Sequence, residues 1–508
     1  MQESHPANAV TALLDEAIQA GAGARAALVG PSGSSTFADL ADTVDRAAHG
    51  LRLRGVGRGD RVALLLVDGL PFAAVFLGAI RIGAVAVPLN TRLRPAEVAP
   101  ILRDACPRLL VAEAERLEEL ATVDGTAGAA TADEVLAQAP AGRIAPEPVG
   151  PDAIALWLYT SGTTGAPKAV MHRHRSLLAG RHYAAGVLGL TAADRIFATS
   201  RLFFAYALGN ALLIPLQARA SAYLHPGWPD PVSVAAVLAG YRPTLFFSVP
   251  TMYNRLLHAD LPREAFASVR LAVSAGERLP AEIHRAWRAR FGGEILDGIG
   301  ATETIFMVLS NRPGASRPGT SGVPVPGTEA RILDADGRVV ADGAPGVLWV
   351  RTPSVAAGYR GRPEHWRAAF LDGWLRTGDL YYKDGDGFHV HSGREDDRFK
   401  VAGQWVVPSE VEALALAHPG VLDAGLAGVE VASGLVKPEL FVVVGAESAA
   451  TVESALRERL ERALLPHQRP HRIRVVAELP RTATGKLQRF RLRELGREDR
   501  ADAERMRE

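Results

Sequence analysis

The alternation of helical and strand periods over the first three hundred residues constrains the fold of this chain most strongly. An amphipathic helical stretch at residues 37–53 is followed by an apolar run at 61–67, a second helical stretch at 71–82 and a second apolar run at 84–89. The same rhythm returns after residue 194. Such alternation is typical of βαβ units, in which helices cover a mostly parallel sheet. We therefore predict an α/β protein with a large domain of helix-covered sheets.

The pattern changes twice further along the chain. After residue 314, short strands separated by glycine, proline and Asp-Gly turns predict a β-rich subdomain. A further unit with two helical stretches and apolar strands begins near Asp396. We predict a large N-terminal domain over residues 1–395 and a small α+β C-terminal domain over 396–508.

Composition excludes several classes of protein. The net charge is only +1, from 57 basic and 56 acidic residues, so the whole chain has no electrostatic attraction to nucleic acid or to a membrane surface. Cys106 is the only cysteine, which excludes an internal disulfide and a cysteine-based metal cluster and fits a reducing compartment. Without a signal pattern at the start or an apolar run long enough to span a bilayer, we predict a cytoplasmic enzyme.

A segment rich in serine, threonine and glycine follows the apolar run at 154–158 and reads YTSGTTGAPK. Backbone N–H groups and hydroxyls between glycines can surround phosphate oxygens, and a lysine adds positive charge. The segment is not a Walker A loop, because Lys168 is followed by Ala169 rather than by serine or threonine. The residues predicted to bind phosphate are Thr160, Ser161, Gly162, Thr163, Thr164, Gly165 and Lys168.

This segment resembles the phosphate loop of the adenylate-forming superfamily, which includes acyl-CoA synthetases, nonribosomal-peptide adenylation domains and luciferases. Four more segments resemble motifs of that superfamily, in the same order along the chain. They are GATE at 300–303, WLRTGD at 374–379, GREDDRFK at 393–400 and PRTATGK at 480–486. The resemblance extends from about residue 37 to 492, so it does not depend on one motif.

The resemblance implies that a carboxylate and MgATP form acyl-AMP and pyrophosphate, and that a thiol then takes the acyl group. Because two anions must approach each other, the site has to supply cations and aligned donors. Lys486 would bridge the carboxylate and the α-phosphate, Glu303 beside Thr302 would hold Mg²⁺, and Asp379 would accept from both ribose hydroxyls. The other residues expected at the ATP or AMP site are Gly276, Glu277, Asp297, Gly298, Ile299, Thr302 and Arg394.

By the same resemblance, the small domain is mobile and rotates about a hinge at Asp396. Rotation would replace Lys486 by the face that carries Val401, Ala402 and Gly403, and Gly403 has no Cβ to obstruct the pantetheine arm of coenzyme A. Lys400 either approaches the pocket in one domain orientation or is a solvated lysine beside the hinge. The expected substrates and cofactors are ATP, Mg²⁺ and coenzyme A.

Within the superfamily, LFFAYALGN at 202–210, DGIG at 297–300, LSNRPG at 309–314 and GLVKP at 434–438 resemble the benzoate-CoA ligase branch. An aryl acid is favoured by the aromatic residues in the first segment and by Ile299, which replaces the tyrosine common in the wider family. Plain core packing is the alternative for those aromatic residues. The residues expected in the acyl pocket are Phe204, Ala205, Tyr206, Gly300, Phe306 and Met307.

The chain departs from this branch at two places. Phe306 and Met307 stand where benzoate ligases typically have His-Ile, and Ala207 stands where a glycine is usual. A phenyl ring in place of an imidazole makes the pocket wall bulkier and more apolar, while methionine can adapt its shape. We therefore expect a compact, planar, apolar acid rather than one with polar substituents.

We predict an ATP-dependent, AMP-forming aryl-CoA ligase that acts on benzoate or a closely related small aromatic carboxylic acid. One alternative is a stand-alone adenylation enzyme that loads an aryl acid onto a carrier protein in trans. A second is an acyl-CoA synthetase for a non-aromatic acid, and a third is a non-catalytic binding homologue. Further partners considered are a second copy in a homodimer and a lysine acetyltransferase acting on Lys486, because residues 480–486 fit an acetylation signature of such synthetases.

Overall fold

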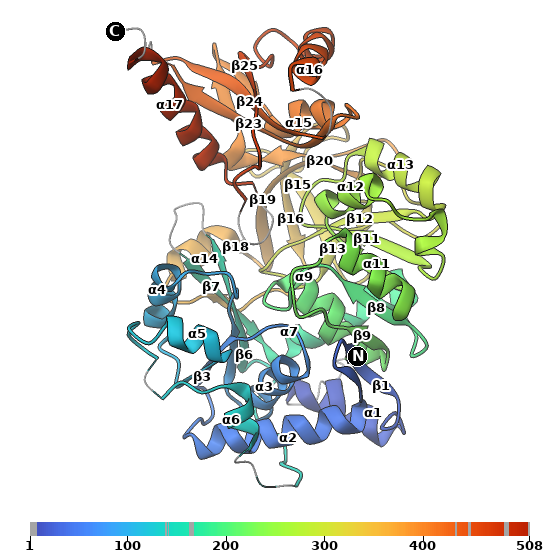
Figure 1. Ribbon diagram of the computed structural model, residues 1–508, viewed down its shortest axis with the longest axis vertical. Helices are drawn as coiled ribbons and strands as arrows, with labels where there is room; N and C mark the ends of the chain where they lie inside the picture. The colour runs from blue at the N-terminus through green and yellow to red at the C-terminus, as the bar shows by residue number, and fades with distance from the viewer. Residues whose placement is uncertain are drawn as a thin grey trace.

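The structure of the 508-residue chain is a computed structural model. It describes residues 8–126, 128–137, 140, 142–161, 167–431, 434–445, 449–481 and 487–505. The strands within these ranges form five sheets, and helices pack on the larger ones (Figure 1). The predicted α/β class is therefore confirmed.

A six-stranded sheet lies in the lower half of Figure 1, with the order β17-β7-β6-β4-β3-β5. Its strands are β3 (Arg61–Leu65), β4 (Val85–Pro88), β5 (Leu109–Ala112) and β6 (Ile154–Ser161), all parallel, with β7 (Pro167–Arg173) and β17 (Gly358–Tyr359) added antiparallel. Val62 and Leu64 of β3 pack with α2 (Phe37–Leu53) and α3 (Leu70–Arg81). Ala63 and Leu65 pack on the opposite face with α4 (Pro95–Ala105). Helices therefore cover both faces, as is usual for a parallel sheet.

A nine-stranded sheet has the order β14-β13-β12-β11-β10-β8-β9-β1-β2. Its parallel strands are β1 (Ala26–Gly30), β8 (Arg195–Ala198), β9 (Ser221–Tyr223), β10 (Leu245–Ser248), β11 (Leu271–Ser274) and β12 (Ile295–Gly300). The antiparallel strands at its edges are β2 (Gly33–Thr36), β13 (Met307–Ser310) and β14 (Val323–Pro324). Phe246 packs with α11 (Pro231–Gly240), α12 (Pro250–His258) and α13 (Ala281–Phe291). Phe247 points to the other face and enters the cluster shared with the six-stranded sheet.

The β-rich part forms a third, antiparallel sheet. Its strands are β15 (Glu329–Leu333), β16 (Gly346–Arg351), β18 (Phe370–Leu371), β19 (Trp374–Lys383) and β20 (His389–Arg394). Leu348, Val350 and Leu375 lie in the core of this sheet. They pack against Val308 and Leu309, which are consecutive residues of β13. The β-rich subdomain is therefore attached to the edge of the nine-stranded sheet.

The C-terminal part occupies the upper end of Figure 1 and has its own apolar core. A single helical turn, η5 (Glu395–Asp397), leads into the hairpin β21 (Phe399–Val401) and β22 (Gln404–Val406). The rest comprises β23 (Val421–Glu430), β24 (Val436–Val444), β25 (Arg472–Val475), α15 (Pro408–Leu416), α16 (Ala449–Ala463) and α17 (Arg489–Arg505). The domain boundary and hinge at Asp396, which lies inside η5, stay predictions.

The remaining helical segments are short. They are η1 (Thr11–Asp15), α1 (Glu16–Gln19), α5 (Ala114–Glu119), α6 (Ala132–Ala137), α7 (His174–Leu178), α8 (Arg181–Tyr183), η2 (Ala184–Leu188), α9 (Ala205–Ala207), η3 (Leu208–Leu213), α10 (Ile214–Ala218), η4 (Arg263–Phe266) and α14 (Pro363–Ala369). In the part of the chain that the structure describes, none of the helices combines the length and apolar character needed to cross a membrane.

Candidate active site

Three segments that are far apart in the sequence meet at Glu303. The ammonium of Lys168 lies 3.4 Å from Glu303 Oε1, and the hydroxyl of Tyr359 donates to the same oxygen at 2.7 Å. The Lys168 ammonium also lies 4.0 Å from the centroid of the Tyr359 ring. All three side chains are partly shielded from solvent, where charge interactions are stronger than in bulk water. The structure therefore brings together a cation and a carboxylate that the sequence assigned to one nucleotide site.

The predicted phosphate loop connects the strands of the β6–β7 hairpin. Thr160 pairs with Lys168 and Ser161 pairs with Pro167, while residues 162–166, including Gly162, Thr163, Thr164 and Gly165, lie outside the described residues. The Thr160 hydroxyl is buried and makes no hydrogen bond to the described residues. Buried polar groups are normally hydrogen-bonded. A ligand oxygen beside Lys168 would satisfy this hydroxyl.

Glu303 lies in the tight connection between β12 and β13. Ala356 N donates to Glu303 O at 2.8 Å, and His172 Nε2 donates to Thr302 O at 2.8 Å. Burial lowers the pKa of His172 to about 4, so the ring is neutral near pH 7. The backbone on both sides of Glu303 is therefore held, by the six-stranded sheet and by the segment before β17.

Asp379, which is predicted to bind the ribose, lies on a strand next to that of Arg394, another residue expected at the ATP or AMP site. Asp379 of β19 pairs with Arg394 of β20, and Arg394 Nη1 donates to Asp379 Oδ1 at 3.1 Å. Asp379 is the main cause of the raised pKa of Arg394, with smaller contributions from Asp396 and Glu303 among others. Gly378 has a φ of +75°, and a Cβ there would lie 3.2 Å from Arg394 Nη2. A glycine at this position thus admits the arginine next to Asp379.

Asp297 is a buried carboxyl group on β12, followed by Gly298, Ile299 and Gly300. Desolvation raises its pKa to about 8, and Oδ1 has no hydrogen-bond partner among the described residues. The fold therefore keeps this group protonated near pH 7. A neutral, buried carboxylic acid can donate as well as accept a hydrogen bond.

Replacing Asp297 with asparagine tests this protonation. Between about pH 4 and pH 8 the folded protein keeps a proton that the unfolded chain releases, so stability falls as the pH rises through this window. Asp297→Asn removes this titration. On going from about pH 5 to pH 8, we therefore expect the free energy of unfolding of the variant to rise by about 1–3 kcal/mol relative to that of wild type. Urea unfolding at both pH values measures the gain, and Asp42→Asn, at an exposed position, is the control. An equal pH slope in wild type and Asp297→Asn would contradict the assignment.

The predicted acyl-pocket residues fall into two groups. Phe204 and Ala205 lie at the start of α9, and the hydroxyl of Tyr206 donates to Val273 O at 3.0 Å. Burial raises the pKa of Tyr206 well above its ordinary value, so it stays a hydrogen-bond donor. The Phe204 ring lies edge-on to that of Trp228, with 6.5 Å between the centroids. Tyr206 is thereby anchored to the nine-stranded sheet.

The second group of predicted acyl-pocket residues lies on the β12–β13 hairpin. Gly300 pairs with Met307, and Phe306 is 3% exposed. Its ring fills space beside Gly180 and Gly209, where an added Cβ would lie 2.6 Å and 3.0 Å from the ring. The predicted bulky wall at Phe306 is thus accommodated by two glycines. Whether both groups line one acyl pocket stays a prediction.

The predicted hinge and coenzyme A residues lie at the start of the C-terminal part. Ala402 and Gly403 form the two-residue turn of the β21–β22 hairpin, with φ values of +48° and +81°, as a type I′ turn requires. The Lys400 ammonium lies 4.8 Å from the ring centroid of the half-exposed Trp405. In this arrangement Lys400 therefore packs on its own hairpin.

Glu277 links the C-terminal part to the large domain. Arg481 Nη1 donates to Glu277 Oε1 at 2.6 Å and Arg481 Nη2 donates to Asp423 Oδ1 at 2.6 Å. Thr251 also donates to Glu277, at 3.0 Å. Lys486, five residues after Arg481, lies outside the described residues. The start of the predicted catalytic-lysine loop is therefore tied to the Gly276–Glu277 segment.

Sequence comparison places this chain in a known family. The AMP-binding enzyme family matches residues 14–360, and the AMP-binding enzyme C-terminal domain matches residues 410–486. The chain belongs to the AMP-binding enzyme family. The predicted resemblance to the adenylate-forming superfamily is thereby confirmed.

Three relatives of this AMP-binding enzyme are informative. The chain is 42% identical to the 3-hydroxybenzoate–CoA ligase of Aromatoleum sp. (strain CIB), over 96% of this chain and 97% of that protein. The structure of the anthranilate CoA ligase AuaEII with anthranoyl-AMP has a TM-score of 0.92 at 33% identity, covering 98% of this chain and 99% of that one. A benzoate CoA ligase from Burkholderia xenovorans LB400 has a TM-score of 0.89 at 36% identity, covering 96% and 99%. The predicted likeness to the benzoate-CoA ligase branch is confirmed.

The fit of Mg²⁺ to this AMP-binding enzyme depends on Glu303. The described residues contain no group of three or more His, Cys, Asp and Glu side chains that could hold a metal ion. Mg²⁺ is, however, usually bound by one or two carboxylates together with substrate phosphates and water. Glu303, beside Lys168 and the predicted phosphate loop, fits that donor set.

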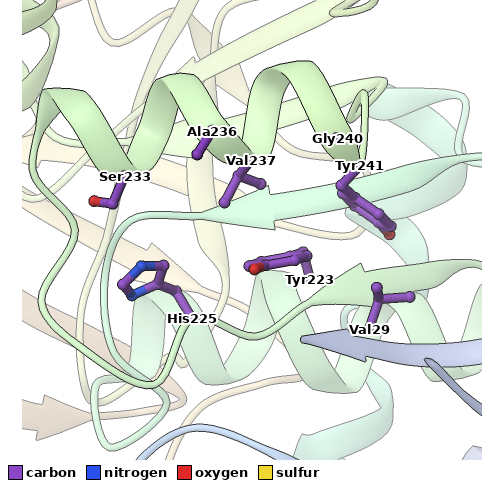
Figure 2. Close-up of a pocket in the computed structure, with 8 residues that line it drawn as sticks. All are labelled: Val29, Tyr223, His225, Ser233, Ala236, Val237, Gly240 and Tyr241. Atoms are coloured by element: carbon purple, nitrogen blue, oxygen red, sulfur yellow. The ribbon is translucent and has the colours of Figure 1, made fainter. Parts of the chain in front are cut away.

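A surface pocket of about 370 Å³ lies elsewhere, between α11 and the strands β1 and β9 (Figure 2). Its lining residues are Val29, Tyr223, His225, Ser233, Ala236, Val237, Gly240 and Tyr241. None of the residues predicted from the motifs lines it. The pocket is thus separate from the candidate active site.

Sequence reasoning gave no individual role to three residues that contact this site, namely His172, Tyr359 and Arg481. His172 follows Lys168 by four residues on one strand, so the period of two places both on the same face. That spacing could have identified it. Tyr359 reaches the site through strand pairing between segments almost two hundred residues apart, for which one sequence gives no signal.

Proposed function

We propose that this AMP-binding enzyme is an AMP-forming aryl-CoA ligase that converts benzoate or a close aromatic relative to its CoA thioester. An oxygen of the carboxylate attacks the α-phosphorus of ATP, giving acyl-AMP and releasing pyrophosphate. The thiol of coenzyme A then attacks the acyl carbon, and AMP leaves with that oxygen. The overall reaction consumes one acid, one ATP and one CoA.

The observation that carries the proposal is the meeting of Lys168 and Glu303 beside the phosphate-loop hairpin. A phosphoryl site needs positive charge for the phosphates and a carboxylate for the metal. The names of the relatives support the remaining features, since one is a hydroxybenzoate–CoA ligase and another was solved with an aromatic acyl-adenylate.

In the first step, Lys168 and the buried Thr160 hydroxyl would steady the outer phosphates. Lys486 would neutralise charge between the carboxylate and the α-phosphate, and Asp379, oriented by Arg394, would accept from the ribose. Mg²⁺ held by Glu303 would supply positive charge to the phosphate oxygens. Each residue thus acts on charge or position rather than through a covalent bond.

In the second step, rotation about Asp396 would bring the Ala402–Gly403 turn in place of Lys486. Release of the Arg481–Glu277 ion pair would have to accompany that movement, because it joins the two parts in the present arrangement. The homodimer and the acetylation of Lys486 stay predictions. Acetylation would remove the lysine charge and block the first step while sparing the second.

The choice of acid follows from the wall at Phe306. Because a buried phenyl ring offers no hydrogen bond to a ring substituent, we expect CoA-dependent AMP release to be about tenfold more efficient with benzoate than with hydroxy- or aminobenzoates. A panel that also includes furoate, cinnamate and hexanoate measures kcat/KM for each acid. Pyrophosphate release without CoA turnover would indicate a carrier protein as the acceptor, and preference for hexanoate would contradict an aromatic pocket.

A further inference from the structure

The connection that carries Glu303 is strained and needs outside support. Ile305 has a φ of +56°, which is unfavourable for a β-branched residue. Phe306 N donates to Thr304 O at only 2.5 Å, two residues back. Strained backbone of this kind persists when neighbouring contacts hold it, and it is often found at functional sites. The contacts around the turn therefore decide where the Glu303 carboxylate lies.

Tyr359 makes two of those contacts with one side chain. Its hydroxyl donates to Glu303 Oε1 at 2.7 Å, and its ring lies beneath the Lys168 ammonium at 4.0 Å. Burial and the charge of Glu303 raise the pKa of Tyr359, so the hydroxyl keeps its proton. Tyr359 thus contacts both members of the Lys168–Glu303 ion pair, whose charged atoms lie 3.4 Å apart.

His172 holds the same turn through the backbone. Its ring is fully buried, and Nε2–H donates to Thr302 O, the carbonyl directly before Glu303. Nδ1 is buried without a hydrogen-bond partner among the described residues. A carbonyl acceptor fixes the ring as the Nε2–H tautomer. Lys168 and His172 project from the same face of β7, so a single strand contacts both the side chain and the backbone at Glu303.

We propose that Tyr359 and His172 are positioning residues for the Lys168–Glu303 pair, and that they set the affinity of the site for MgATP. Tyr359 fixes the direction of the carboxylate and its distance from Lys168. His172 fixes the strained backbone before Glu303. The proposal rests on the proposed function, because it assumes that Glu303 and Lys168 receive MgATP.

Tyr359→Phe tests the first half. The variant keeps the ring beneath Lys168 but removes the donor to Glu303, so we expect the Kd for MgATP to rise roughly tenfold while the KM for the acid changes little. Isothermal titration calorimetry with MgATP and no acid measures the Kd. The control is Tyr241→Phe, which removes a partly buried hydroxyl bonded to Ser221 at 2.8 Å, away from the site. An unchanged Kd in folded Tyr359→Phe overturns this half.

His172→Gln and His172→Leu test the second half as a pair. Glutamine retains an N–H donor that can reach Thr302 O, whereas leucine keeps the bulk and removes the hydrogen bond. We expect the Kd for MgATP to rise roughly tenfold in His172→Leu and to be largely restored in His172→Gln. His174→Leu is the matched control, because His174 is equally buried but accepts from Ala9 N at 3.1 Å. Equal Kd values for the two His172 variants, or the same weakening in His174→Leu, overturn this half.

Measurements on the wild-type enzyme distinguish failure of the proposed function from failure of the two positioning roles. MgATP binding without any CoA-dependent AMP release would reject the aryl-CoA ligase but leave both positioning roles open to the same titrations. Normal ligase activity with unchanged binding in the variants would reject the positioning roles alone. Thermal unfolding of each variant confirms that a weaker Kd does not come from loss of folded protein.

Discussion

Replacement of Lys486 with alanine is expected to lower the rate of adenylate formation by about 10³-fold. The lysine would be the cation between the attacking carboxylate and the α-phosphate, and loss of such a group removes charge stabilisation that develops in the transition state. Pyrophosphate exchange dependent on benzoate measures the first step. The rate at which CoA consumes preformed benzoyl-AMP measures the second step, which we expect to change less than about tenfold because Lys486 would have left the site by then.

Lys437→Ala provides the matched control, since Lys437 lies on β24 of the same C-terminal part. It should leave both rates near the wild-type values. Equal losses in the two steps for Lys486→Ala would contradict a role confined to adenylation. An unchanged exchange rate would instead show that Lys486 has no part in adenylate formation.

Glu303→Gln is expected to lower adenylate formation by about 10²-fold to 10³-fold. Glutamine has nearly the same shape and can still accept from Tyr359, but it removes the negative charge that faces Lys168 at 3.4 Å. We also expect half-saturation to require about tenfold more Mg²⁺, because amide oxygens are weaker ligands than carboxylates for this ion. Rates across a Mg²⁺ series at fixed ATP separate this change from a general loss of activity.

Glu329→Gln is the control for this variant, because Glu329 is exposed and is paired with Arg351 on the β-rich sheet. It should show the wild-type Mg²⁺ dependence. A Glu303→Gln enzyme with reduced activity but an unaltered Mg²⁺ dependence would assign Glu303 to a role other than metal binding.

The individual elements could be predicted well because their periodicity is local. The helix expected at residues 37–53 is α2 with the same bounds, and the apolar run at 61–67 starts at the first residue of β3. The order of strands in the nine-stranded sheet could not be predicted. The order depends on pairing between strands such as β1 and β9, which are almost two hundred residues apart. Periodicity within a segment does not indicate which distant strand pairs with it.

The candidate site was predictable to the same degree. The motifs identified Lys168, Glu303 and Asp379 because their residue types and spacing report chemistry. They did not identify Tyr359 or His172, whose contributions depend on where β17 and β7 lie after folding. Nothing in the sequence marks Tyr359, which lies in a two-residue strand, whereas the spacing of four residues from Lys168 could have indicated His172.

The most direct test of the central claim is the fate of the carboxylate oxygen. Benzoate labelled with ¹⁸O in both carboxylate positions is incubated with the enzyme, MgATP and CoA in unlabelled water, and the products are analysed by mass spectrometry. The acyl-adenylate route predicts one ¹⁸O in AMP, none in pyrophosphate, and AMP and benzoyl-CoA in equal amounts. Unlabelled AMP, or label in orthophosphate formed together with ADP, would contradict it.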